Sequence, residues 1–396
     1  MYRELGYAGR VTLLVLACAS PTGPEPEPPG RGGYPEPRPI EMGDVQPLSW
    51  QELFNRRKLH TLSLRLDDDA TAALAADPGG DQPVDIVIDN RQVGRGRLKM
   101  RGESTEQRWD GKPSFRLDLP RDDDGQVYAG TDELVLDAMV DDPAQARHLA
   151  AAAILADLGA LAPAVVPATV SVNGQPFGLY AVVEVVDSLF VERHLGVPGV
   201  LWDGTEGADF GGEGLAGWED TVPDDGRGDP ADLMAVATVA RSTGDDFFVQ
   251  LANVVNVDTF FLVWTALAAV GHDEGYPYAP GDVYLFQADE DPRFVFLPWQ
   301  VDDGWPRDFE PGAAASVLAV RCLYDEPCRR ALDETLAATR ASLEGSTAQR
   351  SLDDVLALTD AAMEADPRRP YASDEVAVAR VQLAARLRVW AARLGP

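Results

Sequence analysis

The sequence predicts an α+β fold in which a strand-rich N-terminal part is followed by a mainly helical C-terminal part. Apolar and polar residues alternate in several short segments before residue 185, as expected of half-buried strands. Asn173-Gly174 separates two of these segments and is a strong hairpin signal. After residue 231 most segments favour helices. This order is typical of α+β proteins, and we expect a cleft between the two parts.

The N-terminal part is expected to contain two hairpins and two helices. The first hairpin turns at Asp89-Asn90 and the second at Asn173-Gly174. The helices are predicted over residues 69–76 and 144–158, the second ending at Gly159. The predicted strands are His60–Leu66, Val84–Ile88, Val93–Arg101, Ser114–Leu119, Val165–Val172 and Phe177–Val185.

The C-terminal part is expected to be helical around one small strand pair. Residues 203–230 are rich in Gly and Asp, and we interpret them as a flexible insertion. Four arginines at near-helical spacing, Arg380, Arg386, Arg388 and Arg393, predict a solvated face on a helix packed against the main domain. The predicted elements are helices over 188–194, 231–241 and 257–269, strands over 200–202, 283–287 and 293–298, and helices through most of 312–396.

The charge of the chain bears on its partners. The 65 acidic residues outnumber the 34 basic ones, so that the formal net charge is −31. A nucleic-acid partner is therefore excluded as the main ligand, because phosphate backbones would repel this surface. Acidic clusters do favour cations, although a solvated acidic surface is the simpler interpretation for most of these carboxylates.

The N-terminus has the pattern of a lipoprotein export signal. A basic start and the apolar run over residues 11–17 precede Cys18, although Leu16 is not the small residue usually found there. The alternative is an ordinary buried apolar N-terminus, against which the following Pro-rich tract argues. We therefore expect a membrane anchor at lipidated Cys18. The predicted divisions are a signal peptide (1–18), a Pro/Gly-rich linker (19–47), a main domain (48–325) and a C-terminal helical extension packed on it (326–396).

Two further cysteines, Cys322 and Cys328, lie close together in the sequence. An exported protein enters a compartment that permits disulfides, so a local bridge is an expectation that depends on export. A zinc site is excluded because no His or further Cys lies nearby.

Basic and acidic residues mark two candidate sites at the ends of predicted strands. Arg101, Ser104 and Lys112 bring cations and a hydroxyl to adjacent strands, where they would bind phosphate or serve as surface charges. Asp302 and Asp303 follow an apolar strand directly, which suits Mg²⁺ or Ca²⁺ or else forms an Asp-Asp-Gly turn.

Two single carboxylates are further candidates. Glu184 interrupts an apolar run, so that it either faces solvent at an edge or bonds a group in a cleft. Asp273 follows the helix over 257–269 and would be a general base or a turn residue. The neighbouring His272 has no partner pattern for metal binding, and we interpret it as non-catalytic.

Several of these segments, in this order, resemble the CotH (spore-coat protein H) family of atypical, kinase-like proteins. The resemblance covers roughly residues 58–310, and no single motif is decisive. Its motifs are Arg-Gly-x-Ser-Thr at 101–105, Lys-x-Ser-Phe-Arg at 112–116, the helix with a leading Arg at 147–159, Val-Asn-Gly…Gly-x-Tyr…Glu at 172–184, Asp273, the aromatic strand at 283–286, and Pro-Trp-x-x-Asp at 298–302.

The resemblance implies a reduced bilobal protein-kinase-like fold that binds ATP between a β-rich N-lobe and a helical C-lobe. It implies that Lys112 meets the nucleotide phosphates with help from Arg101 and Ser104, while Glu184 lies near the adenine. The substrates that it implies are Ser or Thr residues of surface or envelope proteins.

The resemblance also implies the metal and the base. Asp302 would hold Mg²⁺, and Asp273 would orient the acceptor hydroxyl. Gln300 stands where the family usually has an acidic residue, and Asp282 stands where it usually has Asn, so we expect both beside the metal. Asp203 replaces a Lys of the family pattern.

These departures keep three functions open. The first is an atypical ATP/Mg²⁺-dependent kinase of the cell envelope. The second is a non-catalytic pseudokinase or surface scaffold. The third is a glycan hydrolase that uses Asp273 and Asp302 as its carboxylate pair, which only these generic carboxylates support.

Overall fold

The computed structural model describes residues 48–391 and residue 394, apart from 103–107, 122–126, 205–206, 220–227, 245, 306–308 and 346. The predicted signal peptide with Cys18, the linker and Ser104 therefore lie outside the described residues. The described residues all belong to one compact unit, which begins at Val45.

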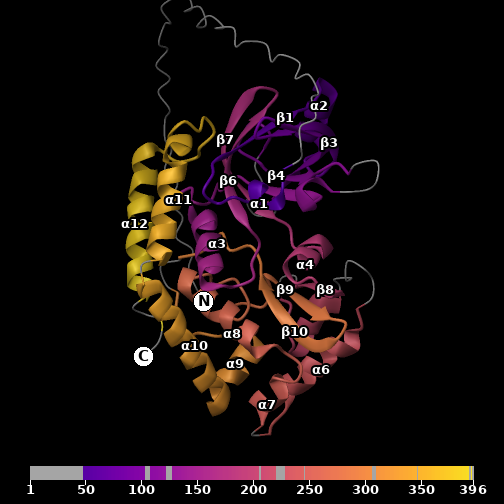
Figure 1. Ribbon diagram of the computed structural model, residues 1–396, viewed down its shortest axis with the longest axis vertical. Helices are drawn as coiled ribbons and strands as arrows, with labels where there is room; N and C mark the ends of the chain where they lie inside the picture. The colour runs from indigo at the N-terminus through magenta and orange to yellow at the C-terminus, as the bar shows by residue number, and fades with distance from the viewer. Residues whose placement is uncertain are drawn as a thin grey trace, which may run out of the picture. The chain divides into compact units, whose positions relative to one another are not determined.

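Seven strands of the N-terminal part form a closed barrel, which is the β-rich half of the α+β fold (Figure 1). β1 pairs antiparallel with β2 and parallel with β6, and this second pairing closes the sheet. Closure leaves no unpaired sheet edge. The barrel order is β1 (His60–Arg65), β2 (Gln82–Ile88), β3 (Arg91–Arg101), β4 (Ser114–Asp118), β5 (Glu133–Asp137), β7 (Gln175–Glu184) and β6 (Val165–Val172).

Side chains alternate along the barrel strands, so that apolar residues fill the interior and the intervening residues form the outer face. Leu98, Phe115 and Leu134 point into an apolar interior, whereas their neighbours along each strand point outward. The predicted strands and both hairpins of this part are confirmed, whereas β5 was not predicted from the sequence. Short helical elements flank the barrel: α1 (Trp50–Leu53), α2 (Asp68–Ala76), a 3₁₀ turn η1 (Tyr128–Gly130) and α3 (Arg147–Leu158).

The helix α3 begins later than the pattern predicted. The Asp142 carboxylate accepts hydrogen bonds from the backbone N–H groups of Ala144, Ala146 and Arg147. Gln145 has a positive φ of 50°, which helical backbone does not allow. The start at residue 144 was therefore wrong, because a loop held by Asp142 replaces the first turn.

A three-stranded sheet lies in the C-terminal part. Its order is β10 (Asp291–Pro298), β9 (Val283–Ala288) and β8 (Gly199–Gly204), with antiparallel pairing throughout. The predicted strand pair is confirmed, and the short strand predicted at 200–202 joins it as β8. The elements around it are α4 (Ser188–His194), η2 (Gly212–Leu215), α5 (Ala216–Glu219), α6 (Pro230–Arg241), α7 (Phe247–Leu251) and α8 (Val257–Val270).

The described part of the predicted insertion at 203–230 is ordered. Phe210 and Trp218 are fully buried in the main core. Asp209 accepts hydrogen bonds from the Tyr276 hydroxyl and the backbone N–H of Val317. The interpretation as a flexible insertion was therefore wrong for these residues, because burial of the aromatic side chains offsets the entropy lost in ordering the Gly-rich backbone.

The last helices of the described residues are α9 (Val317–Tyr324), α10 (Glu326–Glu344), α11 (Thr347–Glu364) and α12 (Ser373–Ala391). α11 packs against α3 and β7, while α12, beside it in yellow in Figure 1, packs against α11 and α8. Cys322 and Cys328 form the predicted local disulfide at the junction of α9 and α10.

The predicted solvated arginine face on α12 was wrong for two of its members. Arg380 is only 7% exposed, and its guanidinium donates to the carbonyls of Ala144 and Leu356. Arg386 donates to the Trp305 carbonyl. A guanidinium offers five donors, so it is buried where backbone carbonyls need partners. Arg393 lies beyond the described residues.

Candidate functional site

Two carboxylates and a histidine meet where the barrel faces the three-stranded sheet. One ligand atom from each of Asp137, His148 and Asp302 lies within 4.8 Å of the others. Asp137 ends β5, His148 lies in the first turn of α3, and Asp302 follows β10. His148 Nδ1 lies 2.8 Å from Asp137 Oδ2. We call these three residues the metal cluster.

The charges of the metal cluster are imperfectly balanced. Burial raises the pKa of Asp302 to about 7, and Asp137 and Asp303 add to this, while His148 opposes it. Burial alone would lower the pKa of His148, but its hydrogen bond to Asp137 and the charge of Asp302 outweigh this effect and raise it. Burial also opposes ionisation of Asp137, yet His148 keeps the pKa of that carboxyl low. A bound cation would relieve the repulsion between the carboxylates.

Three of the predicted residues meet beside the metal cluster. With the Gln300 amide oriented to satisfy its neighbours, its nitrogen donates to Asp282 Oδ1 at 3.3 Å and its oxygen accepts from Arg101 Nη2 at 3.2 Å. Burial raises the pKa of Asp282 to about 7, with contributions from Glu274 and Asp302. Gln300 therefore bridges Arg101, a candidate phosphate-binding residue, and the carboxylate of Asp282.

The backbone is strained at both acidic loops. Asp282 and Gln300 have positive φ angles of 46° and 50°, in the left-handed region. Such conformations cost on the order of 1 kcal/mol or more for residues other than Gly, and they cluster at functional sites. In the three-stranded sheet, the start of β9 pairs with the end of β10, which places these two residues side by side.

The donor set fits a divalent cation. Asp137 and Asp302 offer hard carboxylate oxygens, and Asp282 adds a third carboxylate close enough to feel the charge of Asp302. His148 would have to release its proton to bind through nitrogen. The raised pKa values of Asp282 and Asp302 show that the protein alone does not neutralise these carboxylates.

Lys112 lies behind this region, in the interior. It is 2% exposed, and its Nζ lies 2.8 Å from Asp366 Oδ2 and 3.0 Å from Gln145 Oε1. Burial lowers the pKa of Lys112, whereas Asp366 and, more weakly, Asp137 oppose that shift. Its predicted contact with nucleotide phosphates stays a prediction.

The two single carboxylates lie in different surroundings. Asp273 is exposed in the loop after α8, where partial burial of its carboxyl and the charge of Asp303 raise its pKa. Glu184 ends β7 and is fully buried, as it accepts hydrogen bonds from Trp50 Nε1 at 2.9 Å and the Ala164 N–H at 3.0 Å. It also contacts Arg193. The structure thus gives Glu184 a structural anchoring role, and its predicted contact with adenine stays untested.

Sequence reasoning missed Asp137 and His148. Asp137 ends a strand, Glu133–Asp137, whose short apolar run of three residues was overlooked. His148 directly follows Arg147, which begins one of the motifs named above, so the imidazole could have been predicted from the sequence as a metal ligand. His272 is fully buried outside the metal cluster, and burial lowers its pKa to about 4. Its interpretation as non-catalytic stays a prediction.

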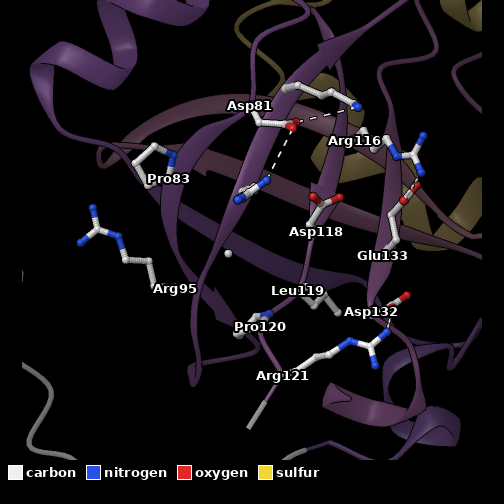
Figure 2. A pocket seen from close by; sticks show the side chains of 13 residues that line it. Asp81, Pro83, Arg95, Arg116, Asp118, Leu119, Pro120, Arg121, Asp132 and Glu133 are labelled. Carbon is white, nitrogen blue, oxygen red and sulfur yellow. Dashed lines mark hydrogen bonds and ion pairs between the residues drawn. The ribbon is translucent and has the colours of Figure 1, made fainter. Parts of the chain in front are cut away.

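A groove of about 1150 Å³ opens on the outer face of the barrel (Figure 2). Figure 2 shows Arg116 directed at Glu133 and Arg121 at Asp132. Lys99 and Arg101 lie two residues apart on β3, so this face of the sheet continues towards Gln300. Its charged lining residues are Arg95, Arg97, Lys99, Arg116, Arg121, Asp81, Asp118, Asp132 and Glu133.

Among the described residues, none of the helices has the length and apolar character needed to cross a membrane. A comparison with curated proteins found no match. A solved structure, the crystal structure of a Helicobacter pylori proinflammatory kinase CtkA, is 8% identical to this chain. The match covers 80% of this chain and 92% of that one, with a TM-score of 0.32, too low to support an argument.

A family model gives the decisive comparison. The model described as CotH kinase protein matches residues 98–389, which run from the end of β3 through β10 and include the metal cluster and most of α12. This match covers most of the chain and extends past residue 325 into the C-terminal helices. The chain therefore belongs to the CotH kinase family.

Proposed function

We propose that this protein is an atypical ATP- and Mg²⁺-dependent protein kinase with a reduced bilobal kinase-like fold. The observation that carries the proposal is the metal cluster of Asp137, His148 and Asp302 beside the Arg101–Gln300–Asp282 group, in a chain of the CotH kinase family. Phosphoryl transfer depends on positioning and charge neutralisation, and this group supplies acidic ligands and a cation together.

Each residue would have a separate task. Asp137 and Asp302 would hold the Mg²⁺ of the nucleotide, with Asp282 as a further oxygen donor. Gln300 would join them by turning its amide oxygen from Arg101 to the metal. The bound metal would neutralise charge on the transferred phosphate. Arg101, which is partly exposed at the end of β3, would bind a phosphate oxygen.

The remaining parts of the site would serve the two substrates. Asp273 is exposed and would orient the acceptor hydroxyl of Ser or Thr. The charged groove would accommodate the part of the nucleotide that extends from the phosphates, because it shares a sheet face with Arg101. We place the acceptors on surface or envelope proteins and the kinase on a membrane through lipidated Cys18.

The test is thermal unfolding of the full chain with ATP, in the presence and absence of Mg²⁺. A ligand that binds only the folded state raises the melting temperature by mass action. We expect Mg²⁺-dependent stabilisation in the wild type, its loss in Asp302→Ala, and its retention in Asp333→Ala, a charge-matched control on the exposed side of α10.

Transfer is then measured by mass spectrometry of envelope proteins incubated with the kinase and ATP. Phosphorylated Ser or Thr that depends on Asp302 supports the kinase. The absence of any ATP-dependent shift at millimolar ATP would instead favour the pseudokinase or scaffold, for which the amide at Gln300 is the structural argument.

A further inference from the structure

The ammonium group of Lys112 is bonded to side chains of the protein itself. Nζ lies 2.8 Å from Asp366 Oδ2 and 3.0 Å from Gln145 Oε1, and 5.2 Å from the centre of the Tyr180 ring. An ammonium group has three donors, so these contacts use most of its bonding capacity. At 2% exposure, Lys112 is poorly placed to bind a phosphate directly.

The carboxylate of Asp366 is held as firmly as the lysine. It follows α11, its side chain is fully buried, and it accepts from the Leu179 N–H at 2.9 Å and the Arg368 N–H at 2.8 Å. A Cβ at Gly178 would overlap this carboxylate, and the φ of Gly178 is +113°, so glycine is required at this close approach.

Gln145 connects the Lys112–Asp366 ion pair to the loop that precedes the metal-cluster residue His148. Its Nε2 donates to the carbonyls of Met139 and Asp142. The Met139 N–H in turn donates to Asp137 Oδ1 at 2.9 Å. Because the other oxygen of Asp137 meets His148, the position of Met139 decides how this carboxylate faces the cluster.

α12 and the segment that joins it to α11 hold the same loop from outside. The Tyr371 hydroxyl donates to the Val140 carbonyl at 2.7 Å, and Arg380 Nε donates to the Ala144 carbonyl at 3.0 Å. Arg368 donates to the Gly111 carbonyl at 2.5 Å, directly before Lys112. In the segment between β5 and α3, Met139 and Gln145 both have positive φ angles. The carbonyls that the C-terminal residues contact, Val140 and Ala144, lie between these two positions.

We propose that Asp366, Lys112 and Gln145 form a positioning relay that fixes Asp137 and His148 for cation binding, so that the C-terminal helices are part of the site. The relay rests on the proposed function only in that the metal cluster binds a divalent cation. It assigns Lys112 a positioning role in place of the phosphate contact that the family resemblance implied. Partners that orient metal ligands typically change metal affinity about 10- to 100-fold when they are removed.

The experiment measures binding of Mn²⁺ alone, without nucleotide, by electron paramagnetic resonance on the full chain. Gln145→Leu cuts the relay while it leaves the ion pair and the net charge unchanged. Lys112→Met with Asp366→Asn removes the pair without leaving either charge unpaired in the interior. Lys58→Met, at an exposed lysine just before β1, is the charge control.

The size of the change separates positioning from simple electrostatics. Gln145→Leu changes no charge, and the double variant removes one positive and one negative charge that are 2.8 Å apart, so simple electrostatics predicts little change in Mn²⁺ binding. We expect instead binding weaker by about tenfold or more for Gln145→Leu and for the double variant, and no further loss when the two are combined. Melting temperatures show which variants remain folded, and Gln145→Leu keeps the test valid if the double variant unfolds.

Unchanged or tighter Mn²⁺ binding in folded Gln145→Leu would overturn the relay, as would a wild type that binds no Mn²⁺. A wild type that binds Mn²⁺ in a relay-dependent way but transfers no phosphate would support the relay and refute the kinase. The two proposals can therefore fail separately.

Discussion

Replacing Asp302 with Asn should stabilise the cation-free protein at pH 8 but not at pH 4. Burial raises the pKa of Asp302 to about 7 from an ordinary 3.8. Between these values the folded state holds a proton that the unfolded state has lost, so the stability falls as the pH rises through this window. Above the folded-state pKa the penalty is complete, and Asn would remove it.

The magnitude follows from the shift. One pKa unit corresponds to about 1.4 kcal/mol, so the full shift sets an upper limit of roughly 4 kcal/mol. Because the Asp302 side chain is only partly buried, we expect about half of this, ~2 kcal/mol. With ~2 cal/mol/K of unfolding entropy per residue and about 350 residues in the folded unit, the melting temperature should rise by about 3 °C.

The assay is differential scanning fluorimetry of the full chain in EDTA at both pH values. Asp333→Asn removes a similar charge from an exposed site on α10 and should change little at either pH. If Asp302→Asn lowers the melting temperature equally at pH 4 and pH 8, the argument from burial and charge is refuted. Adding Mg²⁺ and ATP should reverse the order, since only the wild type keeps the carboxylate that holds the metal.

Three further perturbations test the packing. Gly178→Ala should lower the unfolding free energy by at least about 2 kcal/mol in urea, because its Cβ would overlap a buried carboxylate. Gly174→Ala is the control: it also has a positive φ but lies in open space, and it should cost about 1 kcal/mol. Equal costs for the two variants would contradict the close approach at Gly178. Arg380→Leu should lower the unfolding free energy by about 2 to 3 kcal/mol, because it leaves two buried carbonyls without hydrogen-bond partners. A decrease of less than about 0.5 kcal/mol would show that this arginine is solvated. Replacing Cys322 and Cys328 by Ser should lower the unfolding free energy by about 2 kcal/mol, and an unchanged urea midpoint in oxidising buffer would show that the bridge contributes nothing.

The sequence predicted much of the secondary structure because hydrophobic period and turn chemistry are local. Asn173-Gly174 placed the β6–β7 hairpin, and Gly159 marked the end of α3. The start of α3 was misplaced because Asp142 competes for the backbone N–H groups of its first turn, an effect that depends on loop conformation. Missing β5 had a larger consequence, since its last residue, Asp137, belongs to the metal cluster.

The candidate site was predicted only in part. Arg101, Asp282, Gln300 and Asp302 were named as site residues, and the structure brings them into one region. The partners of Lys112 were beyond sequence reasoning, because Asp366 lies far along the chain, in the segment after α11, and carries no motif of its own.

The sequence by itself thus determined the acidic character of the chain, most of the order of its strands and helices, and the family resemblance, because composition, periodicity and motif order are properties of the linear chain. Only the tertiary structure decided that the sheet closes into a barrel, that His148 meets Asp137 and Asp302, and that Arg380 is buried. The physical reason is that burial sets the charge state and the partners of a polar side chain. Burial depends on which distant segments pack together, and that information is absent from local sequence patterns.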